Sequence, residues 1–294
     1  MDYKRIGILG ATSLVGECLL PLLIADGRQV TAFSRRKVEQ SFMGVDWRQI
    51  YPLPNPPFTL VEGNIHCWIC VAPIWVLSNY FRLFEEHGVC RIVVLSSTSR
   101  FTKHDSSDLQ DRAIAHRLAD AEKRLQVWAE NRDVEWVILR PTLIYGLARD
   151  KNISEITRFI RRFGFFPLFG QAQGLRQPVH AEDVAGACFA ALVATGVKNQ
   201  AYNISGAETL GYREMVSRVF SAIGRCPRFI NVPIGVFRLA VTCLRLLPRY
   251  RHWSAGMAER MNRDMVFDHA DAVRDFGYCP RAFVLSRKDV SGLL

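Results

Sequence analysis

Two glycines near the start of the chain have the spacing of a phosphate-binding turn. Gly10 and Gly16 bracket the run Gly-Ala-Thr-Ser-Leu-Val-Gly, which follows an apolar stretch at residues 4–9 and precedes a helical pattern reaching Ala25. Glycines at a strand-to-helix turn let the backbone approach a pyrophosphate, and the helix N-terminus adds N–H donors and a positive dipole. Ser13 occupies a position where a third glycine is common, and its side chain leaves less space for a pyrophosphate to approach the backbone. The expected contacts are Gly10, Thr12, Ser13, Leu14, Val15 and Gly16.

A basic run ends the next expected strand, Gln29–Phe33. Its residues are Ser34, Arg35, Arg36 and Lys37, and no acidic residue occurs between Gly27 and Glu39. Dinucleotide sites that prefer NAD carry an acid here for the ribose 2′-hydroxyl, whereas arginine accommodates the 2′-phosphate of NADP. The sequence therefore predicts NADP(H), with NAD less favoured, and contacts from Ser34, Arg35 and Arg36. The alternative is a solvated basic turn.

The elements that must position these residues alternate along the first half of the chain. Further strands are expected at 44–49, 65–72, 91–96 and 134–140, with helices at 76–87 and 107–131. Residues 50–62 are rich in proline and too short for a full crossover helix. This alternation predicts an α/β fold with a doubly wound parallel Rossmann sheet and a smaller C-terminal α/β substrate lobe.

Several ordered landmarks resemble the extended short-chain dehydrogenase/reductase superfamily, in its NAD-dependent epimerase/dehydratase branch. They span nearly the whole chain: Gly10–Gly16, Leu95–Thr98, Arg140–Gly146, Leu175–Ala185, Ala201–Gly206 and Asp268–Pro280. The resemblance implies a Rossmann domain over 1–150, to which 175–205 returns, and a substrate lobe made of 151–174 and 206–294. It also implies that Pro141 and Thr142 lie against the nicotinamide, and we expect Ala72 among the cofactor contacts.

The resemblance also assigns catalytic and substrate-binding positions. Thr98 falls on the catalytic Ser or Thr that ends a strand, and Tyr145 lies on the loop nearest the nicotinamide. In nucleotide-sugar epimerases an arginine that matches Arg176 binds the substrate diphosphate, and Arg263 is a second candidate. The implied substrate is therefore a small molecule that contains a diphosphate.

One departure bears on mechanism. The family uses a Tyr, and a Lys four residues later, on the helix after the Ser/Thr strand, to move the alcohol proton. No tyrosine occurs between Tyr80 and Tyr145. Aligning Ala121-Glu122 with the family's Ala-Glu places Ile114 at the Tyr position and Leu118 at the Lys position.

Other polar side chains could replace the missing pair, although each also has a structural explanation. His116 and Lys123 lie on the same predicted helix and could be surface residues. Lys103 and His104 fall in a polar loop. Tyr145 could be a structural aromatic of its loop.

Composition excludes several classes of protein. The 294 residues are 49% apolar and 22% charged, with mean hydropathy +0.04, which excludes collagen, coiled coil and disorder. Net charge is +10, and arginine supplies 31 of the 38 basic residues. Such an excess suggests phosphorylated ligands or an anionic membrane, whereas no nucleic-acid-binding motif occurs, so we expect no nucleic-acid partner. No metal site is expected.

The eight cysteines are expected to be buried thiols of a reducing compartment, which favours a cytoplasmic location. Cys67 and Cys70 are spaced like a CxxC pair, but positions three apart on a strand face opposite sides of a sheet. We therefore expect core cysteines, not a redox or zinc pair.

A second basic and apolar stretch follows residue 229. If 234–247 is helical, Arg238, Thr242 and Arg245 share one stripe, and Arg249 and Arg251 follow. One interpretation is a lobe helix packed on the core. The other is an interfacial helix, within a peripheral membrane contact over 234–251, whose arginines meet lipid phosphates at the inner face of a membrane. No apolar run is long enough to span a bilayer.

Two functions remain open. One is an NADP-dependent oxidoreductase or epimerase/dehydratase that acts on a nucleotide-linked or lipid-linked sugar without the usual Tyr and Lys. The other is a non-catalytic NADP(H)-binding protein, structural or redox-sensing, in a membrane complex or quinone pathway. Family members often pair through two helices, so a homodimer is also expected.

Overall fold

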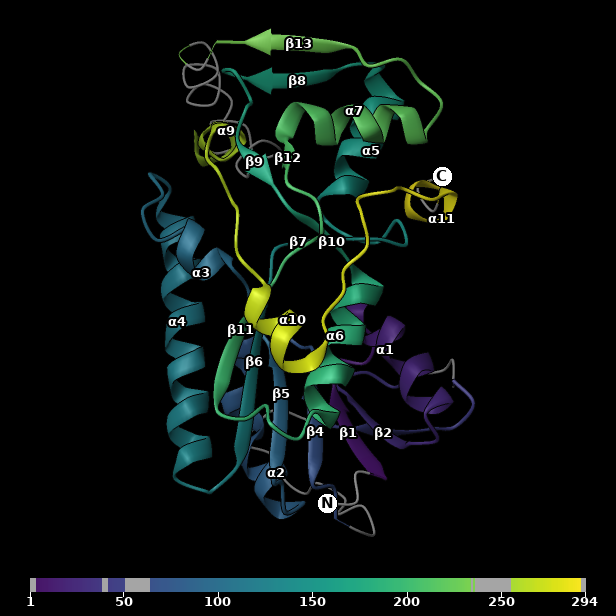
Figure 1. The fold of residues 1–294 in the computed structure, drawn as a ribbon, viewed down its shortest axis with the longest axis vertical. Coiled ribbons are helices and arrows are strands. Elements are labelled where there is room, and N and C mark those ends of the chain that lie inside the picture. Colours follow the sequence, from purple (N-terminus) through teal and green to yellow (C-terminus); the bar gives the residue numbers. More distant parts are fainter. Residues whose placement is uncertain (1–3, 39–41, 51–63, 234, 236–254, 292–294) are drawn as a thin grey trace.

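A seven-stranded parallel sheet forms the larger part of this computed structural model, which describes residues 4–38, 42–50, 64–233, 235 and 255–291 (Figure 1). The strand order is β11-β6-β5-β4-β1-β2-β3. Their bounds are β1 (Arg5–Leu9), β2 (Gln29–Ser34), β3 (Val45–Gln49), β4 (Cys67–Cys70), β5 (Arg91–Leu95), β6 (Glu135–Pro141) and β11 (Gln200–Ile204). The predicted doubly wound α/β fold is confirmed, with its strand order reversing between β1 and β4.

Helices cover both faces of this sheet. On one face lie α1 (Leu14–Ala25) and α6 (Ala181–Val193), which pack against each other and share one apolar cluster with the strands. The other face is covered by η1 (Ile74–Tyr80), α2 (Phe81–Glu86) and α4 (Leu109–Glu130). Cys67 belongs to the first cluster and Cys70 to the second, so the two thiols lie on opposite faces, as the strand spacing predicted.

The smaller lobe surrounds a third apolar cluster. It contains α5 (Ile153–Phe163), β8 (Phe166–Phe169), β9 (Leu175–Arg176), β12 (Leu210–Gly211), α7 (Tyr212–Ala222), β13 (Phe229–Val232) and α9 (Ala255–Asn262). The paired strands β7 (Leu143–Tyr145) and β10 (Pro178–His180) join the lobe to the sheet (Figure 1). The remaining helices are α3 (Ser99–Thr102), α10 (Ala270–Phe276) and α11 (Arg287–Val290).

Three local expectations differ from the structure. The helix expected at 76–87 is a 3₁₀ helix followed by a short α-helix, because hydrogen bonds of the i to i+3 type begin at Pro73. Helix α10, expected in the lobe, packs on α6 and β11 through Ala272. Cys226 and Cys279 are exposed, whereas all cysteines were expected to be buried.

Two predictions fall largely outside the described residues: the missing crossover helix over 50–62, and the helix over 234–247 with the membrane contact over 234–251. In the part of the chain that is described, no helix is both long and apolar enough to cross a membrane.

Candidate functional site

The glycine turn lies where β1 and β4 end side by side. Gly10 has a φ of +93°, and a Cβ on it would lie 2.4 Å from the backbone nitrogen of Ala72. A Cβ on Gly16 would lie 2.5 Å from the carbonyl oxygen of Gly10. Only glycine permits this close passage of three backbone segments, so the turn has the geometry that a dinucleotide pyrophosphate requires.

Ser13 caps the helix that follows this turn. Its hydroxyl oxygen accepts a hydrogen bond of 3.1 Å from the Gly16 N–H, and its own N–H donates to the carbonyl of Gly10 at 2.9 Å. The Ser13 hydroxyl therefore binds the Gly16 N–H, one of the free N–H groups at the start of α1 that could otherwise bind an anion. Of its neighbours, Thr12 is exposed, Leu14 is half-buried and Val15 is buried.

The end of β2 presents two exposed arginines beside this turn. The Ser34 hydroxyl accepts a hydrogen bond from the Arg36 N–H at 3.2 Å, and Gln49 donates to the Arg35 carbonyl at 3.3 Å. These contacts fix the backbone and leave both side chains exposed. Within the described ranges, neither guanidinium forms an ion pair. Two unpaired cations at this strand end match the predicted position of a 2′-phosphate.

Thr98 lies three residues after the end of β5, beside Pro141, the last residue of β6. Its N–H and its hydroxyl both donate to the Pro141 carbonyl, at 3.1 and 3.2 Å. The neighbouring Thr142 hydroxyl donates to the Gln177 carbonyl at 2.5 Å. The structure thus brings Thr98, Pro141 and Thr142 together at the carboxyl edge of the sheet.

One face of α4 near this edge carries two aliphatic side chains and one carboxylate. Ile114, Leu118 and Glu122 are spaced by four residues and share that face. Ile114 is 36% exposed, Leu118 only 3%, and Glu122 is fully buried. Neither aliphatic side chain can donate or accept a proton.

Glu122 forms a buried polar network that the sequence did not single out. Its carboxylate accepts from the Ser96 hydroxyl at 2.5 Å, pairs with Arg140 at 2.6 Å and pairs with Arg100. A buried carboxylate needs such partners, so the network fixes the rotation of α4 against β5 and β6. The only sequence signal was the Ala121-Glu122 pair used for alignment.

Tyr145 lies inside the lobe core, away from solvent. It is fully buried, packs edge-on against His180 and Phe283, and its hydroxyl has no hydrogen-bond partner in the described structure. Burial, reinforced by the negative charge of Asp289, raises the pKa of its phenol well above the ordinary value. In this geometry Tyr145 supports the lobe, whereas the resemblance placed it beside the nicotinamide.

The two proposed diphosphate ligands differ in exposure. Arg176 is buried, and its guanidinium donates to the carbonyls of Leu175 and Arg263 at 2.7 and 2.8 Å, and to that of Arg260. Burial lowers its pKa to about 10. Arg263 is exposed and donates to the Thr102 carbonyl at 3.2 Å, so it bridges from the lobe to α3.

The other polar candidates lie on the surface or in ion pairs. His116 and Lys123 are exposed on α4, and the His116 ring lies 5.6 Å from that of His104. Lys103 pairs with buried Asp111 at 2.7 Å. Asp111 also pairs with Arg260, so the lobe contacts α4 as well as α3, which the sequence did not reveal.

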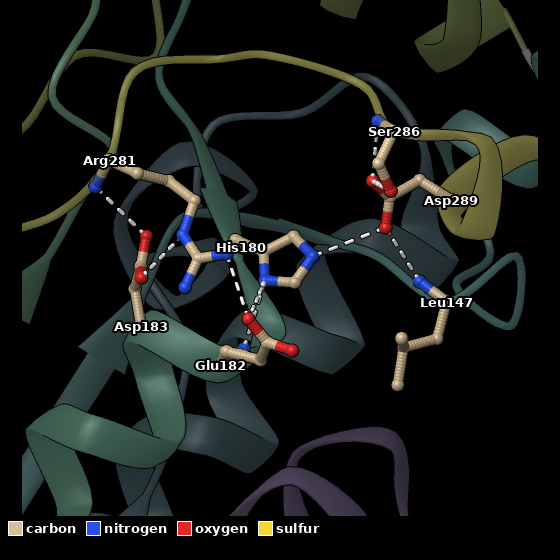
Figure 2. Close-up of polar contacts among 7 residues, drawn as sticks. All are labelled: Leu147, His180, Glu182, Asp183, Arg281, Ser286 and Asp289. Atoms are coloured by element: carbon tan, nitrogen blue, oxygen red, sulfur yellow. Dashed lines mark hydrogen bonds and ion pairs between the residues drawn. The ribbon is translucent and has the colours of Figure 1, made fainter.

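The residues after α10 fasten the lobe to the start of α6 (Figure 2). The Glu182 N–H donates to Nδ1 of buried His180 at 3.2 Å, and His180 Nε2 donates to Asp289 at 3.2 Å. Asp289 also accepts from the N–H groups of Leu147 and Ser286, at 2.9 and 2.8 Å. Burial raises the pKa of Asp289, but these hydrogen bonds outweigh it and hold the pKa well below the ordinary value.

Comparisons with known proteins agree with this geometry. Residues 78–205 match the family model for the NAD dependent epimerase/dehydratase family. A 2-alkyl-3-oxoalkanoate reductase of Stenotrophomonas maltophilia is 26% identical, over 95% of this chain and 96% of that protein. Among solved structures, MoeE5 in complex with UDP-glucose and NAD has a TM-score of 0.67 and 19% identity, over 98% of this chain and 96% of that one.

A further relative is matched over part of its length. The mitochondrial NADH dehydrogenase [ubiquinone] 1 alpha subcomplex subunit 9 of Arabidopsis thaliana is 29% identical over 52% of this chain, which covers 35% of that protein. The match therefore spans about a third of this curated relative.

A seven-stranded Rossmann sheet with a glycine turn at its switch point defines a dinucleotide-fold protein. Residues 78–205 match the NAD-dependent epimerase/dehydratase family, and the described chain shares its fold with the solved structure of MoeE5.

Proposed function

We propose that this protein binds NADP(H) and acts as an oxidoreductase or epimerase/dehydratase on a nucleotide-linked or lipid-linked sugar. The observation that carries the proposal is the pair of exposed arginines beside the glycine turn, Arg35 and Arg36, which form no ion pair with any residue that the structure describes. The fold match to a structure that holds UDP-glucose and NAD, and the similarity to a reductase over nearly the whole chain, support the same chemistry.

The chain's own residues would divide the work as follows. The backbone from Gly10 to Gly16 would hold the pyrophosphate, with Ala72 beneath it, and Ser34, Arg35 and Arg36 would hold the 2′-phosphate. When bound, the nicotinamide supplies hydride transfer. Pro141 and Thr142 would limit the space beside its ring. Thr98 would orient the substrate oxygen with its hydroxyl.

Arg176 and Arg263 are the proposed diphosphate ligands. Because the Arg176 guanidinium is already bonded to backbone carbonyls, we expect the larger loss of substrate affinity on substitution of Arg263. Proton transfer would come from a water relay, since Ile114 and Leu118 are apolar and Tyr145 is buried. We also propose that the chain has two domains. The cofactor domain would comprise 1–150 and 175–205, and the substrate lobe 151–174 and 206–294. Substrate would then enter between the lobe and the sheet.

A second candidate is a non-catalytic NADP(H)-binding protein, structural or redox-sensing, within a membrane complex or quinone pathway. The apolar face of α4 favours it, because no ionisable group occupies the positions aligned with the family's Tyr and Lys. The similarity to a subunit of an NADH dehydrogenase supports it as well.

Calorimetric titration with NADPH and with NADH tests the cofactor proposal first. We expect micromolar binding of NADPH and binding of NADH at least about tenfold weaker, because charged hydrogen bonds to a phosphate contribute about 1.5–3 kcal/mol each. Absence of binding by either dinucleotide would overturn both candidate functions.

Charge reversal locates the phosphate contact. The double variant Arg35→Glu/Arg36→Glu should weaken NADPH binding about 100-fold or more and leave NADH binding nearly unchanged. Arg117→Glu/Arg124→Glu, two exposed arginines on α4, is the matched control and should bind NADPH as the wild type does. Equal losses in both variants would contradict a specific 2′-phosphate site.

A further inference from the structure

One corner of the lobe lies at the end of the molecule opposite the sheet, where α5 ends and where β8 and β13 begin (Figure 1). Phe166 pairs with Phe229 in the two-stranded sheet, and the Phe166 N–H donates to the Arg228 carbonyl at 2.8 Å. Arg225 donates to the Ile160 carbonyl at the end of α5, at 2.7 Å. These contacts bring two distant segments together. We name the aromatic–basic corner by its residues Arg158, Arg162, Phe163, Phe165, Arg228 and Ile230.

The corner exposes large apolar side chains. Phe163 is 52% exposed and Ile230 is 49% exposed. The Phe163 ring lies 4.6 Å from that of Phe159 and 6.3 Å from that of Phe165, so the exposed ring is held by its neighbours. Exposed aromatic and aliphatic side chains that gather in one place mark contact surfaces on soluble domains.

The same corner carries cations with no acidic partner. Arg158, Arg162 and Arg228 are exposed, and in the ranges that the structure describes none of them forms an ion pair. Arg162 lies over the Phe163 ring at 5.4 Å. The dipole of α5 accounts for a basic residue at its C-terminus, but Arg228 comes from another element and needs a different explanation.

The sequence around this corner also lacks acidic residues. Residues 156–170 and 221–233, which form the corner, contain no Asp or Glu, whereas they contain five arginines. Such a local excess of positive charge attracts polyanionic surfaces.

We propose that the aromatic–basic corner docks on an anionic phospholipid membrane. Arg158, Arg162 and Arg228 would contact lipid phosphates, while Phe163 and Ile230 would enter the boundary between headgroups and acyl chains. An aliphatic side chain such as Ile230 cannot stack on a base, so the pairing of apolar and cationic residues favours lipid over nucleic acid. This proposal is independent of the cofactor and of any catalytic activity.

Vesicle co-sedimentation of the whole protein tests it. The probes are vesicles of phosphatidylcholine alone and vesicles with added phosphatidylglycerol, each at low and at high salt. We expect binding to the anionic vesicles only, weakened by salt. Each arginine near an anionic membrane strengthens binding about fivefold. The triple variant Arg158→Glu/Arg162→Glu/Arg228→Glu should therefore bind at least about 100-fold more weakly.

Two controls separate the corner from overall charge and from apolar contact. The variant Arg117→Glu/Lys123→Glu/Arg124→Glu reverses three exposed basic residues on α4 and should bind as the wild type does. Phe163→Ser should weaken binding to anionic vesicles and leave its salt dependence unchanged. Thermal melting confirms that each variant is folded.

Three results would overturn the proposal: no binding of the wild type to anionic vesicles, equal binding by the wild type and the corner triple variant, or equal losses in the corner and α4 variants. Tighter binding of duplex DNA than of vesicles at the same salt, abolished by the corner variant, would assign the corner to nucleic acid and would also overturn it.

Discussion

The glycine turn and the apolar face of α4 lie at the same carboxyl edge of the sheet, yet they differ in how well they suit chemistry. At the turn, Gly10 and Gly16 permit backbone contacts that no other residue allows. On α4, the predicted alignment places Ile114 and Leu118 at the positions of the family's proton-transferring pair, and both side chains are aliphatic. The Glu122 carboxylate on that face accepts a hydrogen bond from Ser96 and forms ion pairs with Arg100 and Arg140. Under the proposed function, cofactor binding would depend on the turn and proton transfer on α4, so one could change without the other.

The largest effect is expected at the turn. Gly16→Ala would place a Cβ 2.5 Å from the Gly10 carbonyl, which must shift, and should cost about 3–4 kcal/mol of stability together with NADPH binding. Gly186→Ala on α6 is the matched control, because a Cβ there meets nothing within 4 Å. It should stabilise the protein by about 0.5–1 kcal/mol. Urea unfolding measures the change in the free energy of unfolding for both variants. Similar changes in the two would contradict a special backbone requirement at Gly16.

Rebuilding the α4 face tests the other half of the comparison. Leu118→Lys should destabilise the protein by about 3 kcal/mol, because it buries an ammonium group without a partner. Ile114→Tyr should cost under about 1 kcal/mol, because that side chain is partly exposed. Thermal melting measures both. If Leu118→Lys were tolerated as well as Ile114→Tyr, the buried apolar contact assigned to Leu118 would be wrong.

Acid titration tests the contact between Asp289 and His180, which lies outside both the glycine turn and the α4 face, and so serves as a reference for the comparison. Since the folded pKa of Asp289 is depressed, its contribution to stability is complete above the unfolded pKa of about 3.9 and is lost as pH falls below it. Asp289→Asn should therefore cost about 2 kcal/mol at pH 7, and this difference should shrink towards pH 3. Urea unfolding at both pH values checks it. NADPH affinity at pH 7 should not change.

A small effect on stability is expected at Thr98. Thr98→Ala removes one hydrogen bond to the Pro141 carbonyl and should cost about 1 kcal/mol. Its effect on NADPH oxidation separates the two candidate functions, with UDP-sugars and quinones as the substrates screened. An enzyme should lose most of its turnover, whereas a non-catalytic protein should bind NADPH unchanged and show no turnover to lose.

Local sequence patterns predicted the sheet well, because the apolar periodicity of each strand and helix is contained within a few consecutive residues. The helix at Leu14–Ala25 and the strand at Arg91–Leu95 agree with their predicted bounds within a residue or two. The positions of Tyr145 and Arg176 could not be predicted, because burial depends on side chains far away in sequence, such as Phe283 and the backbone at Arg260. The Glu122 network was likewise hidden, since its partners come from β5, α3 and β6.

The contact between His180 and Asp289 has a consequence for protein synthesis. The two residues are 109 positions apart, and the imidazole is translated first. At ribosomal rates of about 5–20 residues per second, Asp289 is synthesised roughly 5–20 s after His180. During that interval α6 can form on the emerging sheet, but Asp289 is not yet there to anchor its first turn to β7. The nascent chain therefore passes through a stage in which the sheet is assembled and the junction with the lobe is still open.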